Sequence, residues 1–195
     1  MARHQEFDTA EALQKAMGVF WRKGFEATSL MDLLDATGLS KSSLYGTFGS
    51  KRELFLNAFD AYREHRLREM FRILRNGSGR QAIETFFRMI VADAESVEFT
   101  NGCMSINQAV EMAPHDADIR QRVVNDFGNI GKTLVETIQR GKTDGSIKSN
   151  RDAQTLAQFF ILGFPGLQVM IRAGCGKTML EHALNALLSS LDKNE

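Results

Sequence analysis

The residues best suited to recognition chemistry gather in one short segment, GLSKSSLYGTFGSK, at residues 38–51. Ser40 has the residue type of a helix N-cap, so a short helix is expected from Lys41 to about Phe48. A helix in the major groove of DNA needs small or polar residues near its exposed N-terminal end, because bulk there keeps it from the base edges. The predicted base-reading residues are Lys41, Ser42, Ser43 and Thr47, and Gly46 between them is also expected at the DNA.

The phosphates beside such a groove need hydrogen-bond donors. Tyr45 and Lys51 carry suitable side chains, and Thr28 and Ser29 precede another short helix whose first N–H groups are free to donate. We therefore expect these four residues to contact the DNA backbone. On spacing alone, an ordinary helical hairpin with solvated ends is the alternative.

The elements that must position these residues are helices. Asp8 and Glu11 have capping-box spacing for a first helix that ends at Gly24, and a second short helix ends at Gly38. Two short helices across a glycine turn are typical of a helix-turn-helix. Ser50 begins a longer helix towards Arg75.

The rest of the chain also reads as helical, after a turn at Asn76–Gly79. Apolar residues recur at helical spacing in several segments: residues 83–91, 103–112, 117–141, 152–173 and 178–192. We expect three regions, with bounds 1–50, 51–75 and 76–195. The predicted fold class is all-α.

Composition supports that class and excludes others. The 195 residues are 43% hydrophobic and include only 2 Pro and 2 Tyr against 14 Phe and 9 Met, which favours helices over many short strands. The net charge is +0, so any nucleic-acid site must be local. Two distant cysteines and no His/Cys cluster predict neither a disulfide framework nor a metal site.

Two segments bear on location. The N-terminus lacks the apolar stretch of a signal peptide, which favours a cytoplasmic protein. Residues 153–171 carry no charge over nearly a membrane-spanning length, but three glutamines and the Gly163–Gly166 interruption favour a helix buried on all sides rather than a membrane span.

Residues 7–55 resemble the DNA-binding domain of the tetracycline-repressor (TetR) family of bacterial transcriptional regulators. The matching residues are Ala16, Phe20, Gly24, Phe25, Thr28, Gly38, Leu39, Ser40, Leu44, Tyr45, Phe48, Lys51 and Leu54. The resemblance implies a helix-turn-helix DNA-binding domain at residues 1–50, a connecting helix at 51–75, and a ligand-binding and dimerisation domain at 76–195.

The function so implied is a transcriptional regulator, most simply a repressor: a homodimer that binds a palindromic double-stranded operator and is released by a small apolar or reactive effector. No cofactor and no enzymatic activity are expected. The alternative is a helical small-molecule-binding protein or enzyme that uses an apolar C-terminal cavity; no paired carboxylates, nucleophile triad or metal-ligand spacing favours it.

Candidate effector-site residues are aromatic, sulfur-containing or amide side chains of the C-terminal region, although plain core packing explains each of them as well. They are Phe86, Phe87, Met89, Met104, Gln108, Phe127, Gln158, Phe160 and Phe164. Cys103, at a helix start after Gly102, is a candidate redox sensor, because helix N–H groups stabilise a thiolate; a buried, inert cysteine is the alternative.

Homodimerisation is predicted through the segments at 152–173 and 178–192. The first is apolar all round. The second carries a leucine stripe, Leu180, Leu184, Leu187 and Leu191, which a monomer would cover only in part.

Overall fold

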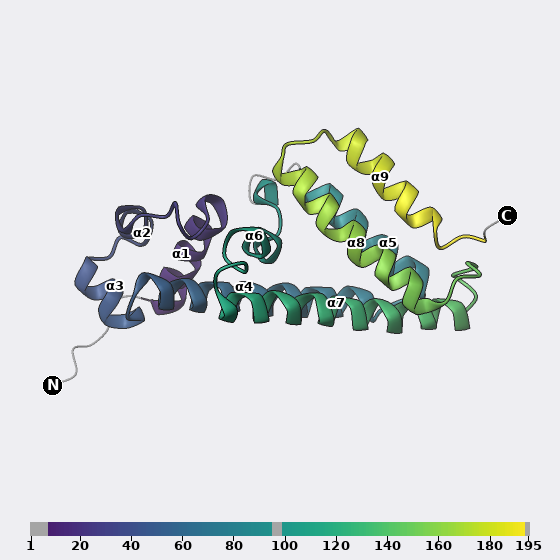
Figure 1. The fold of residues 1–195 in the computed structure, drawn as a ribbon, viewed down its shortest axis with the longest axis horizontal. Helices are drawn as coiled ribbons and strands as arrows, with labels where there is room; N and C mark the ends of the chain where they lie inside the picture. The colour runs from purple at the N-terminus through teal and green to yellow at the C-terminus, as the bar shows by residue number, and fades with distance from the viewer. Residues whose placement is uncertain (1–7, 95–98, 194–195) are drawn as a thin grey trace. The chain divides into compact units, whose positions relative to one another are not determined.

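The computed structural model of the chain describes residues 8–94 and 99–193 (Figure 1). Within these ranges every regular element is helical, as the sequence predicts. The elements are α1 (Thr9–Lys23), α2 (Leu30–Thr37), α3 (Lys41–Phe48), α4 (Lys51–Leu74), α5 (Gly79–Asp93), the 3₁₀ helix η1 (Phe99–Asn101), α6 (Met104–Glu111), α7 (Ala117–Thr143), α8 (Ala153–Arg172) and α9 (Lys177–Ser189).

The chain divides into two compact units, Met1–His65 and Arg66–Glu195, and the division falls within α4. The sequence places the main boundary later, at the Asn76–Gly79 turn. Residues 51–74 contain neither glycine nor proline, so nothing in them ends a helix at the division. A single helix therefore contributes to both units.

Side-chain caps set the helix starts of the N-terminal unit. The Asp8 carboxylate accepts the N–H of Ala10 at 2.8 Å and begins α1. The Ser50 hydroxyl accepts the N–H of Glu53 at 3.1 Å and begins α4. Each cap satisfies an N–H group that the first turn of a helix leaves without a partner, so local sequence fixes where these helices begin.

Aromatic rings fill the core of this unit. The Phe55 ring of α4 lies 5.2 Å from that of Phe20 in α1 and 5.0 Å from that of Phe25, both edge-on. Trp21 and Tyr62 meet at 5.1 Å. Edge-to-face contacts at these distances are favourable, and they bind α1 to the first half of α4. The packed helices α1 and α4 thus support α2 and α3.

The core of the C-terminal unit lies among α5, α7, α8 and α9. Close helix contacts need glycine there: a Cβ on Gly79 would stand 2.4 Å from the Gly141 Cα and 2.5 Å from the Thr137 carbonyl oxygen. Gly141 does not end α7, which runs on to Thr143. The start of α5 therefore packs directly on the backbone of α7.

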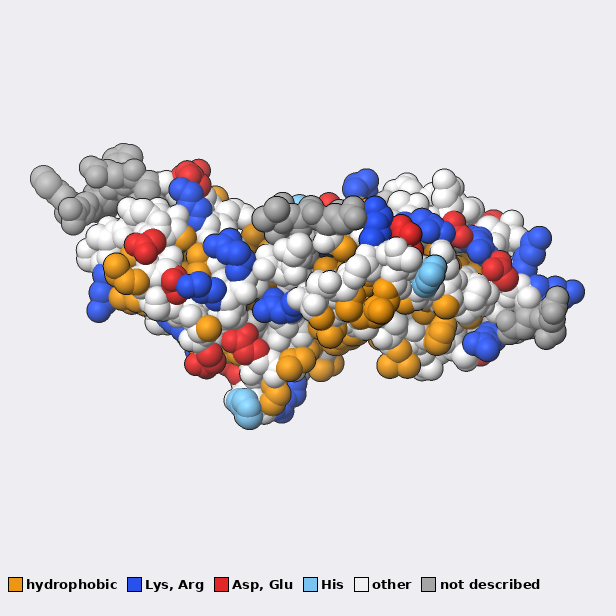
Figure 2. All heavy atoms as spheres, turned by 90° about the horizontal axis from the view of Figure 1, so that it is seen from above, with side chains coloured by type: hydrophobic (Ala, Val, Ile, Leu, Met, Phe, Trp, Pro, Cys, Tyr) orange, Lys and Arg blue, Asp and Glu red, His pale blue; other side chains and the backbone are white. Residues whose placement is uncertain are grey.

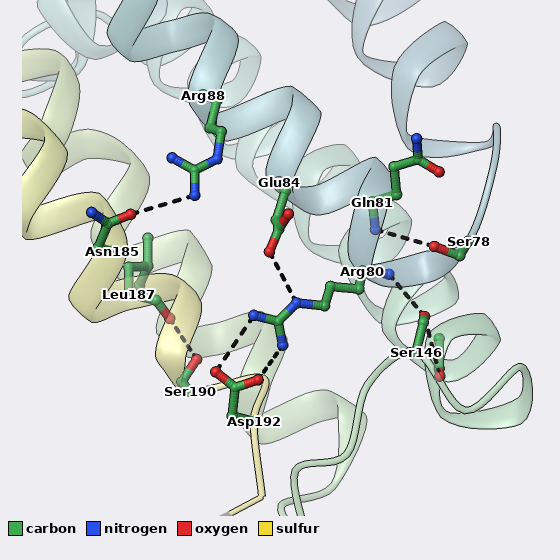
Figure 3. A network of polar contacts seen from close by, with 11 residues as sticks. Ser78, Arg80, Gln81, Glu84, Arg88, Ser146, Asn185, Leu187, Ser190 and Asp192 are labelled. Carbon is green, nitrogen blue, oxygen red and sulfur yellow. Dashed lines mark hydrogen bonds and ion pairs between the residues drawn. The ribbon is translucent and has the colours of Figure 1, made fainter.

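Polar contacts join the start of α5 to the chain's C-terminal end, as Figure 3 shows. Arg80 pairs with Glu84 at 2.9 Å and with Asp192 after α9. Its backbone N–H donates to the Ser146 hydroxyl at 3.1 Å, and the N–H of Gly79 donates to Asp144 at 3.0 Å. Hydrogen bonds from Ser146 and Gly79 lower the pKa of Asp144. This network fixes the loop after α7 and the end of α9 on the same side of α5.

The leucine stripe of α9 is not a free surface, so the prediction that a monomer would cover it only in part is wrong. Its four members are all buried in the core of their own chain: Leu180, Leu184, Leu187 and Leu191. The stripe faces inward because α9 packs against both α5 and α8.

Helix α8 is long and apolar enough to cross a membrane by length and composition alone, a test that a buried core helix also passes. It is not buried on all sides, contrary to the sequence prediction. Leu162 is 77% exposed, and Phe159 and Val169 share its face at spacings of three and seven residues. Helices α7 and α9 cover the other faces, so one apolar face is left open.

Candidate nucleic-acid interface

Helix α2 is fixed at its start by a complete capping box. The Ser29 hydroxyl accepts the N–H of Asp32 at 3.1 Å, and the Asp32 carboxylate accepts the N–H of Ser29 at 2.9 Å. Lys23, at the end of α1, donates to the other Asp32 oxygen at 2.6 Å. These hydrogen bonds, that from Lys23 first, lower the pKa of Asp32 to about 2. Because Asp32 bonds both Lys23 and Ser29, it holds the exposed start of α2 against α1.

Thr28 lies inside the unit, although the sequence predicts a phosphate contact for it. It is buried, and its hydroxyl donates to the Gly24 carbonyl oxygen at 2.6 Å. Its N–H points back to Phe25 at 3.3 Å. The structure thus commits both donors of Thr28 to the turn after α1, and Ser29, which is exposed, is the residue at the surface.

The turn between α2 and α3 is as tight as the sequence predicts. Gly38 has φ +70°, a left-handed conformation that side chains rarely adopt, and its N–H caps the Leu34 carbonyl at 2.8 Å. Two residues later Ser40 begins α3, accepting the N–H of Ser43 at 3.2 Å. A helix-turn-helix is therefore present.

The surface of α3 is small and polar at its N-terminal end. Lys41 and Ser42 are exposed, and the hydroxyls of Ser42 and Ser43 each lie 3.0 Å from the Ser40 hydroxyl. These three hydroxyl groups form a compact cluster that can both donate and accept hydrogen bonds. An open surface depression lies beside them, lined by Ser40, Lys41, Ser42 and Tyr45.

The second turn of α3 carries little side-chain bulk on its exposed side. Gly46 is exposed, and a Cβ built on it meets no atom within 4 Å. Thr47 beside it is half-buried. Because Gly46 has no side chain, the backbone of α3 can approach a partner more closely there than at any bulky residue.

Tyr45 and Lys51 flank this surface, both half-buried. The Lys51 ammonium lies 4.5 Å from the centre of the Phe25 ring, a cation–π distance that orients the side chain at the start of α4. Eight of the nine predicted DNA-contact residues are thus at least partly exposed on one unit; Thr28 is the exception.

The predicted effector-site residues are only partly brought together. Four rings are buried in mutual contact: Phe86 lies 5.3 Å from Phe87 and 6.2 Å from Phe164, and Phe87 lies 5.1 Å from Phe160. Met89 and Phe127 are partly buried against the same core, and Met104 is fully buried.

The two candidate glutamines differ. Gln108 on α6 is fully buried, whereas Gln158 on α8 is exposed, so the structure does not bring Gln158 to the aromatic core. Gln158 lies at the surface because one face of α8 is open to solvent.

Cys103 is the N-cap residue of α6, as its position after Gly102 predicts, and it is partly buried against the core. Its side chain makes no capping hydrogen bond. Cys175 is also partly buried, because its N–H bonds to the Met170 carbonyl at 3.0 Å and folds the loop back on α8.

The open apolar face of α8 lies within the segment 152–173, for which the sequence predicts a dimer contact. Its residues are Phe159, Leu162 and Val169, and Met179 in the first turn of α9 is exposed as well. The spacing of 159, 162, 166 and 169 is a helical stripe, but it is hidden in the sequence because α8 is apolar on every side.

Two family models match the chain. The one described as "Bacterial regulatory proteins, tetR family" covers residues 12–58, and "Tetracyclin repressor-like, C-terminal domain" covers residues 79–187. Together they contain the helix-turn-helix and most of the second unit.

Curated proteins match this chain in sequence over most of its length. The chain is 32% identical to the uncharacterized HTH-type transcriptional regulator YezE of Bacillus subtilis, over 98% of this chain and 100% of that protein. It is 31% identical to the HTH-type transcriptional repressor ComR of Escherichia coli, over 88% and 83%.

Among solved structures, the fold is similar to that of a cysteine mutant of the TetR-family transcriptional regulator CifR, complexed with 26-bp double-strand operator DNA. The TM-score is 0.85 at 30% identity, covering 97% of this chain and 99% of the other. The resemblance seen in residues 7–55 is thereby confirmed and extends through the second unit. The chain belongs to the tetR family of bacterial transcriptional regulators.

Proposed function

We propose that this regulator is a repressor that binds a palindromic operator duplex as a homodimer, with α3 in the major groove. The observation that carries the proposal is the surface of α3. Lys41 and the hydroxyl cluster stand exposed at its start, and Gly46 leaves its second turn bare. Those are the properties that let a recognition helix reach base edges.

The surrounding residues divide by role. Lys41, Ser42, Ser43, Gly46 and Thr47 face the bases, while Ser29, Tyr45 and Lys51 contact phosphates and set the register of the unit on the duplex. Thr28 supports Ser29 through its bond to Gly24. Arg and Lys contacts to phosphate supply affinity for any sequence, so specificity rests on the first group.

The open face of α8 supports a homodimer. Figure 2 shows hydrophobic side chains gathered on the surface of the C-terminal unit. The large exposed hydrophobic residues of α8 and α9 are Phe159, Leu162, Val169 and Met179. A twofold-symmetric contact would place the same stripe from each copy against the other and remove it from water. The dimer surface is thus centred on α8, with the start of α9 beside it.

The effector is a small apolar or reactive molecule that acts on the C-terminal unit. It relieves repression by binding the DNA-incompetent conformation of the dimer more tightly than the competent one. Cys103 offers a reactive route: oxidation or alkylation would add bulk at the N-cap of α6.

The rival function is a helical binding protein or enzyme that uses the aromatic core. The four core rings are in mutual contact, as in ordinary packing. We therefore propose a non-enzymatic, cytoplasmic regulator that needs no cofactor.

Gel-shift titration of the full chain against an enriched duplex tests the proposal. Lys51→Ala should weaken binding to all sequences and reduce the slope of log affinity against log salt by about one. Ser42→Ala and Thr47→Val should instead change the preferred sequence. If Lys51→Ala and the parent bind with the same affinity and salt slope, α4 does not contact phosphate as proposed.

A further inference from the structure

Helix α6 carries polar side chains on a face that is buried. Ser105, Gln108 and Glu111 recur every third residue and so lie along one side of the helix. Ser105 and Gln108 are at least nine-tenths buried. The Ser105 hydroxyl donates to the Asp126 carboxylate of α7 at 2.7 Å, so its hydrogen-bonding is met within the protein.

Gln108 is different, because only half of its amide group is satisfied. Its Nε2 donates to the Glu111 carboxylate at 3.1 Å. An ionised carboxylate only accepts hydrogen bonds, so the NH₂ group must face Glu111 and the amide orientation is fixed. Its Oε1 is buried and has no hydrogen-bond partner among the residues that the structure describes. A buried carbonyl oxygen without a donor is a rare and unfavourable arrangement.

The surroundings of Gln108 limit what could supply that donor. Met104 lies four residues before it on the same face of α6, and Met112, the C-cap residue, lies four residues after it; both are buried. Methionine side chains adapt to apolar molecules of different shape. The carboxylate of Glu111, 3.1 Å from the same amide, opposes any anion.

We propose that Gln108 Oε1 accepts a hydrogen bond from the hydroxyl group of a neutral, mostly apolar effector such as a phenol or a hydrophobic alcohol. This deepens the proposed function, on which it rests, by naming the effector's chemical class. A neutral donor is required because the site offers an uncharged acceptor in apolar surroundings, where an ion would lose its hydration.

Helix α6 is suited to admit such a molecule. It has eight residues, and its N-cap makes no side-chain hydrogen bond. Isolated helices of this length are marginal, so α6 is held by packing and by contacts such as Ser105 to Asp126. A ligand on Gln108 that moves α6 against α7 then shifts the conformation of the C-terminal unit.

The test uses the full-length protein without DNA and two matched probes, 2-naphthol and 2-methoxynaphthalene, which differ in a single hydrogen-bond donor. Calorimetric titration should give at least tenfold tighter binding of the naphthol to the parent. Gln108→Met, close in volume, should lose that preference, whereas Gln158→Met, at the exposed glutamine, should keep it. Circular dichroism should show both variants folded, with Gln108→Met at least as heat-stable as the parent.

Equal binding of the two probes by the parent, or no binding of either, overturns the proposal without reference to any variant. A preference that survives in Gln108→Met also overturns it. Operator binding is measured separately by gel shift. Parent protein that binds operator but does not distinguish the probes contradicts this inference alone, whereas protein that distinguishes them but binds no operator contradicts the repressor proposal and leaves the site in place.

Discussion

The open face of α8 predicts a specific effect of shortening Leu162. The residue is 77% exposed in the single chain, so a dimer contact that covers it removes most of its surface from water. Leu162→Ala removes three carbons, each contributing about 0.8 kcal/mol when buried, or about 2 kcal/mol per subunit after allowing for partial exposure. Twofold symmetry applies the change twice, so the dimer should lose about 4 kcal/mol, roughly a thousandfold in dissociation constant.

Sedimentation velocity across nanomolar to micromolar concentrations measures that loss. Val110→Ala is the matched control, because Val110 is 76% exposed but lies on α6 and not on α8. We expect the control to dimerise like the parent and Leu162→Ala to dissociate, with unchanged circular dichroism. Equal dissociation constants for parent and Leu162→Ala would refute the assignment of this face.

Three further predictions concern single residues. Hydrogen bonds from Lys23 and Ser29 lower the pKa of Asp32 to about 2 from 3.8, so the stabilisation that they provide is present above pH 4 and is lost as pH falls towards 2. The urea midpoint of Asp32→Asn should therefore fall less over that range than the parent's. Urea midpoints that fall equally with pH in both proteins would contradict this. Gly79→Ala should lower the free energy of unfolding by about 2 kcal/mol or more, because the new Cβ meets the Gly141 backbone. Gly128→Ala, with open space around it, should not lower it. Equal urea midpoints for Gly79→Ala and the parent would show that α5 can move aside. Mild peroxide should release operator from the parent and from Cys175→Ser but not from Cys103→Ser, and release from all three would make Cys103 an inert core residue.

Helix starts were predictable because their signals are local. Asp8, Ser29, Ser40 and Asp116 each accept N–H groups two or three residues ahead, and that chemistry depends on neighbours in the chain. The left-handed conformation of Gly38 is likewise a local requirement of the turn and does not depend on tertiary contacts. The helix-turn-helix surface followed from these signals together with the family resemblance.

The errors arose where tertiary packing decides. Periodicity finds the leucine stripe of α9 but not whether it faces its own core or another chain, and here α5 and α8 bury it. Thr28 carries a suitable hydroxyl for phosphate, yet the carbonyl of Gly24, four residues earlier, takes its proton. Gln108 and Gln158 have equal chemistry in the sequence, and only the fold separates a buried amide from an exposed one.

The central claim is that α3 reads a palindromic operator, and selection from a randomised duplex pool at moderate salt tests it most directly. We predict enrichment of an inverted repeat whose half-sites bring two recognition helices about 34–36 Å apart, one DNA turn or a multiple of it. Ser42→Ala protein put through the same selection should enrich altered half-sites with the same spacing. A pool that shows no enriched sequence, or one enriched without inverted symmetry, would contradict the account.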